Sequence, residues 1–296
     1  MRKPTDTGGN LFSKVLDFYL FSNLHIAVCA VALVGVTQEL FEYHLRRELY
    51  VFVFCGTFFL YNLQRLPSAF ANVQIESVFR RHSWNTQHRK LLLGVSVVAM
   101  IAALWAFLHL YRRTQIIALI PAALSVAYAF PAIYWRKRWI KLREIPMIKI
   151  FIVGIVWGMS CVWVPAAADD SFPQWTSPEV TTWMISCSLM IFAITVPFDI
   201  RDLHYDGTRL RTLPAIFGLK KAIAIAIAGM LLSFGGIALA DNLSTLVEFH
   251  HVVIYGAWTL LTCIVIAMSR PERHEYYYSF LIDGLMVVLW AMLRWL

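Results

Sequence analysis

The chain has 296 residues, of which 59% are hydrophobic and only 15% are charged. An average soluble domain carries about 25% charged residues, so this composition excludes an ordinary water-soluble domain, and it also excludes a disordered chain. The formal net charge is +8. In a membrane protein this excess of lysine and arginine is expected on cytoplasmic loops, so it need not indicate nucleic-acid binding.

A membrane-spanning helix needs about 20 consecutive apolar residues. Runs of about this size recur along the chain, and most connections between them are short. The second run continues past Arg65 to about residue 70, and the last run contains one acid, Asp283. We expect a single all-α integral-membrane domain over residues 1–296. Its nine predicted spanning helices are residues 18–38, 49–64, 91–111, 114–135, 150–168, 180–198, 222–240, 249–269 and 276–293.

The basic residues are distributed unevenly between alternate loops. If the N-terminus lies inside, all but five of the 26 lysines and arginines fall on the inner side. The outer side then holds Arg46, Arg47, Arg112, Arg113 and Arg294. This asymmetry agrees with the positive-inside rule. We therefore expect the N-terminus inside and the C-terminus outside, in a bacterial cytoplasmic membrane.

Three acidic residues follow the sixth predicted span at helical spacing. Asp199, Asp202 and Asp206 occupy positions i, i+3 and i+7, so a continued helix places them on one face. Like charges on one face repel one another unless a cation lies among them, and Mg²⁺ binds carboxylates together with substrate phosphates. Arg209 and Arg211 follow at once and are suited to phosphate oxygens. The other interpretation is a solvated acidic helix end with basic neighbours.

The segment PFDIRDLHYDGTRLRTLPAIFG, residues 197–218, resembles the second aspartate-rich motif of the UbiA superfamily of intramembrane prenyltransferases. That motif has roughly the form N/D-x-x-x-D-x-x-x-D, followed by a basic residue, Thr-Leu and a glycine that opens the next helix. Asp202 and Asp206 match the last two acidic positions. Phe198 stands where the first Asn or Asp is expected, with Asp199 beside it. The resemblance in helix number, topology and motif position covers essentially the whole chain.

The family's first acidic motif, roughly N-D-x-x-D-x-x-x-D, is incomplete in this chain. It belongs at the inner end of the second span, where the sequence is YNLQRLPSAF. Asn62 is kept, but the acidic positions hold Leu63, Leu66 and Phe70. Arg65 lies in this segment, and a guanidinium can bind diphosphate bidentately and do part of a metal ion's electrostatic work. Alternatively, Arg65 is a snorkelling residue at a helix end.

Asp283 lies within the last predicted span, roughly 10 Å below the inner surface at a rise of 1.5 Å per residue. An acid at this depth is costly unless it is paired, and such residues are commonly functional. A structural ion pair is the other interpretation, with Arg65 as one candidate partner. The candidate substrate-binding residues are thus Asn62, Arg65, Arg209, Arg211 and Asp283.

The resemblance implies a Mg²⁺-dependent transfer of an isoprenyl group from its diphosphate to a lipophilic acceptor that enters from the bilayer. In this interpretation Asp202 and Asp206, assisted by Asp199, are the catalytic metal ligands. One alternative is a catalytically degenerate UbiA-like protein that binds or carries a polyprenyl lipid, and the incomplete first motif favours it. A second alternative is a solute transporter, which the nearly uncharged spans disfavour.

Overall fold

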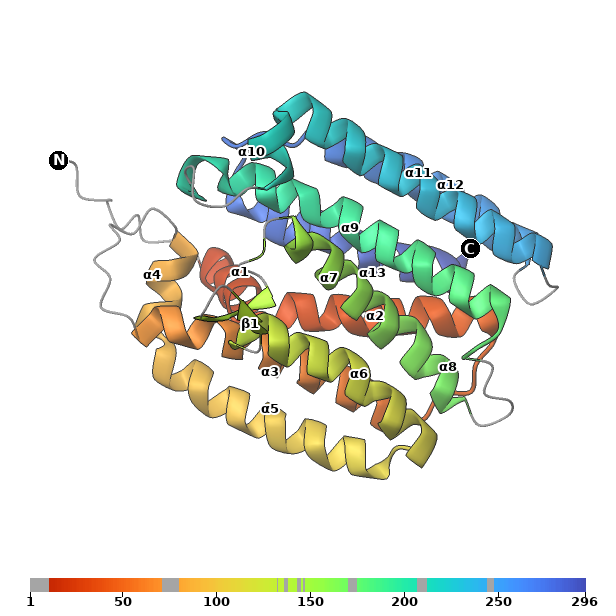
Figure 1. The fold of residues 1–296 in the computed structure, drawn as a ribbon, viewed down its shortest axis with the longest axis horizontal. Helices are drawn as coiled ribbons and strands as arrows, with labels where there is room; N and C mark the ends of the chain where they lie inside the picture. The colour runs from red at the N-terminus through yellow and green to blue at the C-terminus, as the bar shows by residue number, and fades with distance from the viewer. Residues whose placement is uncertain are drawn as a thin grey trace.

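The computed structural model describes residues 11–70, 80–131, 133–135, 138–142, 145, 147–169, 175–206, 212–243 and 248–296. Its long helices lie side by side in one bundle (Figure 1). The predicted all-α class is confirmed, and the described residues depart from it in one short antiparallel ribbon, where β1 (Ile133–Trp135) pairs with β2 (Arg138–Ile140).

The helices follow one another with short connections. The N-terminal half contains α1 (Leu11–Phe21), α2 (Leu24–Phe41), α3 (Arg47–Phe70), α4 (Arg80–Gln87), α5 (Arg89–His109) and α6 (Arg112–Ala129). The C-terminal half contains α7 (Ile148–Gly158), the π-helix η2 (Met159–Trp163), α8 (Val164–Ala168), α9 (Pro178–Asp206), α10 (Leu213–Phe217), α11 (Leu219–Leu243), α12 (Phe249–Ala267), the π-helix η3 (Tyr277–Ile282) and α13 (Asp283–Trp295).

Seven segments among the described residues are long and apolar enough to cross a membrane. Helices α3 and α6 lie among them in Figure 1, but neither is one of these seven segments. The predicted total of nine spans therefore stays a prediction. The seven segments are Leu24–Phe41, Arg89–His109, Ile148–Ala168, Pro178–Leu203, Leu219–Ala240, Phe249–Ala267 and Tyr277–Trp295.

The edges of the bundle expose apolar side chains, as a lipid-facing surface does. Val98 and Leu108 on α5 are 65% and 64% exposed, and Leu232 on α11 and Leu260 on α12 are both 64% exposed. Helices hydrophobic on the outside are expected only where the solvent is hydrocarbon. Together with the spanning segments, this surface identifies an integral membrane protein.

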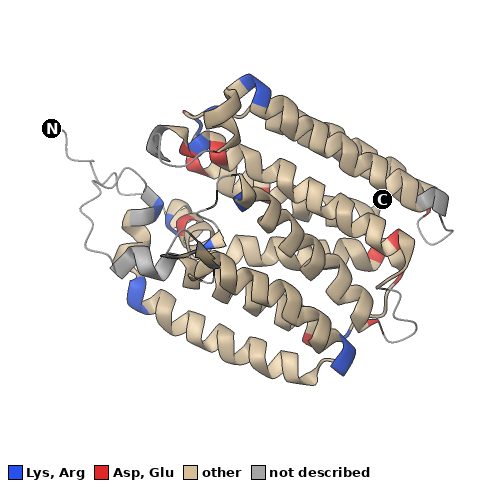
Figure 2. Cartoon of the chain, viewed as in Figure 1, with Lys and Arg blue, Asp and Glu red and all other residues tan. Residues whose placement is uncertain are grey.

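The polar ends of the bundle differ in charge. Lysines and arginines gather at the end where α4 and the start of α5 lie, and a smaller basic group marks the α5–α6 connection at the opposite end (Figure 2). The same asymmetry was the basis for expecting an inner N-terminus. Because no bilayer side is marked in the structure, the orientation stays a prediction, and we refer to the basic end as the inner end.

Among the helix boundaries that differ from the predicted spans, two have a local cause in the sequence. The first span was expected to start at residue 18, but the helix breaks at Ser22–Asn23, where Asn23 has a φ of 70°. Asparagine tolerates this left-handed conformation better than most residues. The fourth span was expected to reach residue 135, but α6 ends at Ala129 and Phe130 is extended. The reason is Pro131, because a proline disfavours helical backbone in the residue before it.

Helix α9 lies in the middle of the bundle and positions the candidate site. It packs against α7 and α11, while α2 packs against α3 and α13. At the outer end, the Trp183 indole of α9 donates to the Thr37 hydroxyl of α2 at 3.0 Å, and Thr37 donates to the carbonyl of Cys161 at 2.7 Å. These buried bonds hold α2, η2 and α9 together. The sixth span was expected over residues 180–198, but α9 continues through Asp199, Asp202 and Asp206, which is the condition for a shared face.

Candidate functional site

Two arginines and one glutamate meet at the inner end of the bundle. Arg81 comes from α4, Arg201 from α9, and Glu275 from the segment just before η3. One carboxylate oxygen of Glu275 lies 3.1 Å from a guanidinium nitrogen of Arg201 and 3.6 Å from one of Arg81. All three side chains are 15–17% exposed. The two cations therefore share the Glu275 carboxylate in a largely dry environment.

Arg201 has the most partners in this cluster. Its guanidinium binds the Asp202 carboxylate through two nitrogens, at 2.8 and 3.4 Å. The guanidinium carbon also lies 5.2 Å from the Phe198 ring centre and 5.7 Å from that of Tyr278. Both distances are within the range of a cation–π contact. These contacts fix the planar guanidinium at the mouth of an apolar cavity.

Arg81 is held from two sides and keeps one donor unused. Its guanidinium donates to the Asn23 side chain at 3.0 Å and to the Ser279 hydroxyl at 3.4 Å. Its Nε is buried with no hydrogen-bond partner among the described residues. Burial and the neighbouring Arg201 guanidinium lower the pKa of Arg81 to about 10, so the side chain remains charged at neutral pH. An unused donor on a buried cation is suited to an anionic ligand.

The two arginines open into a cavity of about 180 Å³, which we call the arginine cavity. Asp283 also lines it, and its charge acts favourably on both guanidinium groups. The structure thus brings this predicted residue to the site, although its partners are arginines that the sequence did not single out. The remaining walls are mostly apolar or aromatic, from Ile26, Tyr61, Val153, Trp157, Ile191, Ile194, Thr195, Phe198 and Met286.

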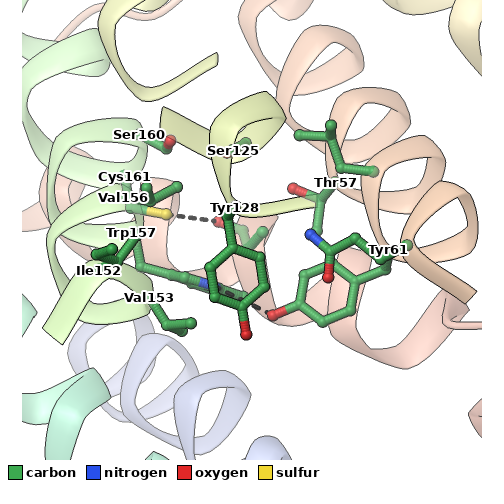
Figure 3. Close-up of a pocket in the computed structure, with 13 residues that line it drawn as sticks. Thr57, Tyr61, Ser125, Tyr128, Ile152, Val153, Val156, Trp157, Ser160 and Cys161 are labelled. Atoms are coloured by element: carbon green, nitrogen blue, oxygen red, sulfur yellow. Dashed lines mark hydrogen bonds between the residues drawn. The ribbon is translucent and has the colours of Figure 1, made fainter. Parts of the chain in front are cut away.

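A second cavity of about 160 Å³ adjoins the first, and we call it the middle cavity. The two cavities share three wall residues, Tyr61, Val153 and Trp157. The Trp157 indole donates to the Tyr61 hydroxyl at 3.3 Å, and the two rings meet edge to face (Figure 3). This aromatic pair forms the boundary between the cavities.

The three predicted metal ligands are not equivalent. Asp199 is almost fully buried, and its carboxylate accepts a 2.6 Å hydrogen bond from Lys149 of α7. Asp202 is bound by Arg201 as described above. The side chain of Asp206 lies outside the described residues. In the part of the chain that the structure describes, no three His, Cys, Asp or Glu side chains gather to hold a metal ion. The described residues therefore do not by themselves fit a resident Mg²⁺ ion.

Asn62 is buried, and its side-chain amide is hydrogen-bonded to other residues of the protein. Its nitrogen donates to the carbonyls of Ser22 and Phe58 at 3.0 and 2.9 Å, and its oxygen accepts from Asn23 at 2.9 Å. These bonds stabilise the break between α1 and α2. Its predicted role in substrate binding is untested, and the geometry indicates a structural one. The side chain of Arg65, and all of Arg209 and Arg211, lie outside the described residues.

Sequence reasoning missed the roles of four charged residues: Arg81, Lys149, Arg201 and Glu275. Arg81 and Lys149 had been counted only as basic residues of inner loops. The one available signal was Arg201, which sits inside the aspartate-rich segment and alternates with its acids. Glu275 had no signal of its own, because its importance depends on folding a distant loop against α9.

No family model matches this sequence, and no curated protein matches it. Solved structures do match it in fold. A UbiA homologue from Archaeoglobus fulgidus bound to GPP and Mg²⁺ has a TM-score of 0.68 and 9% identity, over 94% of this chain and 98% of that one.

Two further structures agree with that match. A UbiA homologue from Aeropyrum pernix K1 without ligand has a TM-score of 0.62 and 15% identity, over 92% of this chain and 96% of that one. A structure concerning digeranylgeranylglyceryl phosphate synthase in membranes has a TM-score of 0.59 and 14% identity, over 95% and 96%. The likeness spans nearly the full length of each chain, and it establishes the UbiA fold.

Proposed function

From the fold that this chain shares with UbiA homologues, we propose that it binds an isoprenyl diphosphate at the inner end of the bundle and transfers the isoprenyl group to a lipophilic acceptor from the bilayer. The observation that carries this proposal is that Arg81 and Arg201 both line one end of a mostly apolar cavity. An isoprenyl diphosphate has the same two halves, a compact anion and a hydrocarbon chain. The homologue bound to GPP and Mg²⁺ supports the same assignment.

In this proposal the arginines stabilise the leaving group. The bond between the first isoprenyl carbon and the diphosphate oxygen breaks, and its electron pair leaves with the diphosphate. Once the diphosphate is bound, Arg81 and Arg201 are charged and oriented, so they stabilise the charge that develops during the reaction without moving further. The walls of the arginine cavity exclude water from the allylic cation, and the faces of Tyr61 and Trp157 are suited to contact it. An electron pair of the acceptor then forms the new bond, and the acceptor loses a proton.

Dependence on Mg²⁺ is a separate proposal. Two structures of the Archaeoglobus fulgidus homologue contain Mg²⁺, but here Asp199 and Asp202 are each paired with a basic side chain. We attribute the neutralisation of the diphosphate first to the arginines. That Asp202, Asp206 and Asp199 hold Mg²⁺ stays a prediction.

The pairing of Asp199 with Lys149 and of Asp202 with Arg201 favours one alternative function. A protein in which Asp199 and Asp202 are already neutralised, and whose first acidic motif is incomplete, is suited to bind or carry a polyprenyl lipid without reacting it. Binding at the arginine cavity is common to both functions, and turnover distinguishes them.

The test uses the purified full chain in detergent with radiolabelled geranyl diphosphate, Mg²⁺ and a membrane lipid extract. Transfer predicts labelled lipid product, whereas a carrier predicts binding without product. Arg81→Met and Arg201→Met should each weaken binding by tenfold or more, because a lost hydrogen bond to a charged group costs about 1.5–3 kcal/mol. The matched control is Arg89→Met, an exposed arginine at the start of α5. Parental binding by both site variants would contradict the proposed site.

A further inference from the structure

A second polar pocket lies at the outer end of the bundle, away from the arginine cavity, and we call it the outer pocket. Residues from the end of α2, the start of α12 and the end of α13 line it, and its volume is about 660 Å³. Its described charged residues are three acids, Glu39, Glu42 and Glu248, and one base, Arg294. With neutral histidines these residues carry an excess of negative charge, and none of them takes part in the proposed function.

The acids of the outer pocket differ in their partners. One guanidinium nitrogen of Arg294 donates to Glu39 at 3.4 and 3.5 Å, and Glu248 lies 2.9 Å from an imidazole nitrogen of His250. The Glu42 carboxylate has no hydrogen bond or ion pair with any residue that the structure describes. The side chain of Arg294 is 58% exposed, and its other two nitrogens remain open as donors. The pocket therefore keeps an available acid and an available base.

Two polar groups in the wall of the outer pocket are buried without a partner. Nδ1 of His251 and the hydroxyl of Tyr43 form no hydrogen bond among the described residues, although each residue is only 8% exposed. Buried groups of this kind are rare in native structures, and a ligand or an ordered water is a common explanation. The charges of Glu42 and Glu248 also act on His251. The terminal torsion of histidine is broad, which lets the ring turn Nδ1 toward a ligand.

The chemistry of these groups favours an ammonium ligand. An ammonium donates three hydrogen bonds, and Glu42, Glu248 and a neutral His251 each supply an acceptor. A metal ion is disfavoured, because the described His, Cys, Asp and Glu side chains form no set of three that could hold one. Arg294 is suited to a phosphate on the same ligand. The outer pocket therefore matches a zwitterion with one phosphate and one ammonium group.

Exposed apolar side chains adjoin the outer pocket. Phe249 precedes His250 and Trp295 follows Arg294, and these two aromatic residues are 73% and 74% exposed. Phe249 begins α12 and Trp295 ends α13, so both lie where these helices reach the membrane surface. Tryptophan is enriched at that level of a membrane. A ligand that also has hydrocarbon chains is therefore favoured over a soluble zwitterion.

We propose that the outer pocket binds the headgroup of a phospholipid that carries a primary amine, as phosphatidylethanolamine does. The ammonium lies between Glu42, Glu248 and His251. The phosphate faces Arg294, and the acyl chains run along the apolar surface beyond Phe249. A bound headgroup contacts α2, α12 and α13 together and stabilises their packing at the outer end. The site is separate from the arginine cavity, so this inference does not depend on the proposed function.

The test is native mass spectrometry of the full chain in detergent, with equal amounts of dioleoyl phosphatidylethanolamine, phosphatidylcholine or phosphatidylglycerol. The parent should bind phosphatidylethanolamine at least about fivefold more tightly than either other lipid, because only its ammonium donates hydrogen bonds to the acids. The double variant Glu42→Gln/Glu248→Gln should lose that preference. Arg294→Met should weaken all three lipids, since each contains a phosphate. The matched control is Glu272→Gln, an exposed acid at the inner end.

Water-soluble phosphoethanolamine distinguishes a lipid from a free headgroup. It should displace phosphatidylethanolamine only at about a hundredfold higher concentration, because it has no acyl chains to bury. Displacement at equal concentration would assign the outer pocket to a soluble amine and overturn the lipid assignment.

Two other results would also overturn the inference. One is equal binding of the three lipids by the parent, which tests the site without any variant. The other is an unchanged lipid preference in Glu42→Gln/Glu248→Gln. This double variant should keep the parent's affinity for inorganic diphosphate, because its substitutions are exposed and lie far from the arginine cavity. The outcome at the outer pocket is therefore independent of the outcome at the inner end.

Discussion

The carboxylate of Glu275 lies 3.1 Å from the guanidinium of Arg201 and also faces Arg81, so an internal anion lies where we propose that diphosphate binds. Glu275 is held there by a hydrogen bond of 3.0 Å from Ser279. A ligand with more negative charge has to displace this carboxylate or share the arginines with it. The free protein therefore pairs its buried cations internally, and ligand binding has to work against that pairing.

We predict that Glu275→Gln lowers the stability of the free protein and tightens the binding of inorganic diphosphate. Removing the charge leaves the two arginines less compensated, and the ligand then restores the balance. The expected gain is about fivefold, corresponding to about 1 kcal/mol for a partly exposed charged hydrogen bond. Thermal unfolding with and without diphosphate measures both effects. The exposed Glu272 of the same loop supplies the control Glu272→Gln, and weaker diphosphate binding by Glu275→Gln would contradict the competition.

The Lys149–Asp199 pair should be structural and mutually dependent. Asp199→Asn leaves a largely buried lysine without its carboxylate, and we expect a loss of about 1–3 kcal/mol in unfolding free energy. Adding Lys149→Met removes the unpaired charge and should restore part of the loss. The measurement is a double-mutant cycle of unfolding in detergent. Strictly additive losses would show that the 2.6 Å contact contributes no coupling.

We predict that Asn62 contributes to folding stability and not to diphosphate affinity. Asn62→Ala leaves the Asn23 amide and the Ser22 carbonyl without their partner, at a cost of about 1–3 kcal/mol for each buried group left unsatisfied. We therefore expect a lower unfolding temperature and, in the fraction that remains folded, diphosphate affinity close to that of the parent. Gln64→Ala on the same helix is the comparison. Weaker affinity in a fully stable Asn62→Ala protein would instead support the role in substrate binding.

Mg²⁺ dependence is predicted to require the acids of α9. With Mg²⁺ present, Asp202→Asn and Asp206→Asn should each abolish the Mg²⁺-dependent part of diphosphate binding, because the metal loses a carboxylate ligand. In EDTA the residual binding should persist and should depend on Arg81 and Arg201. Titration of diphosphate with and without EDTA measures both parts. If neither aspartate variant changed the titration, the motif resemblance would not extend to metal coordination.

Topology can be tested with reporter fusions in a bacterial host. The charge distribution predicts that Arg138 and Thr208 lie inside and that Ala167 and Asn242 lie outside. Accessibility of a fused reporter on either side of the membrane gives the answer directly. An inside signal at Asn242 would contradict the nine-span prediction, because it would change the number of crossings between the last helices.

The sequence alone determined the features that depend on local composition. Apolar runs long enough for a bilayer predicted the membrane class and located most of the spans. The spacing of Asp199, Asp202 and Asp206 places them on one face if the helix continues, and α9 does continue through all three. The end of α6 was predicted wrongly at residue 135 from the apolar run, although its cause is local, because Pro131 acts on the residue before it. These signals lie within a few residues of the structure that they produce.

Only the tertiary structure decided which charges form the site. Arg81, Arg201 and Glu275 belong to three separate segments and meet only when α4, α9 and the start of η3 pack together. Asn62 resembled a motif residue, yet its partners are Ser22 and Asn23, about 40 residues away in the chain. In a bilayer a buried charge or amide is stable only with its partner, and packing supplies that partner. Spacing along the chain shows that a polar residue is unusual, but which groups neutralise it depends on contacts between helices far apart in sequence.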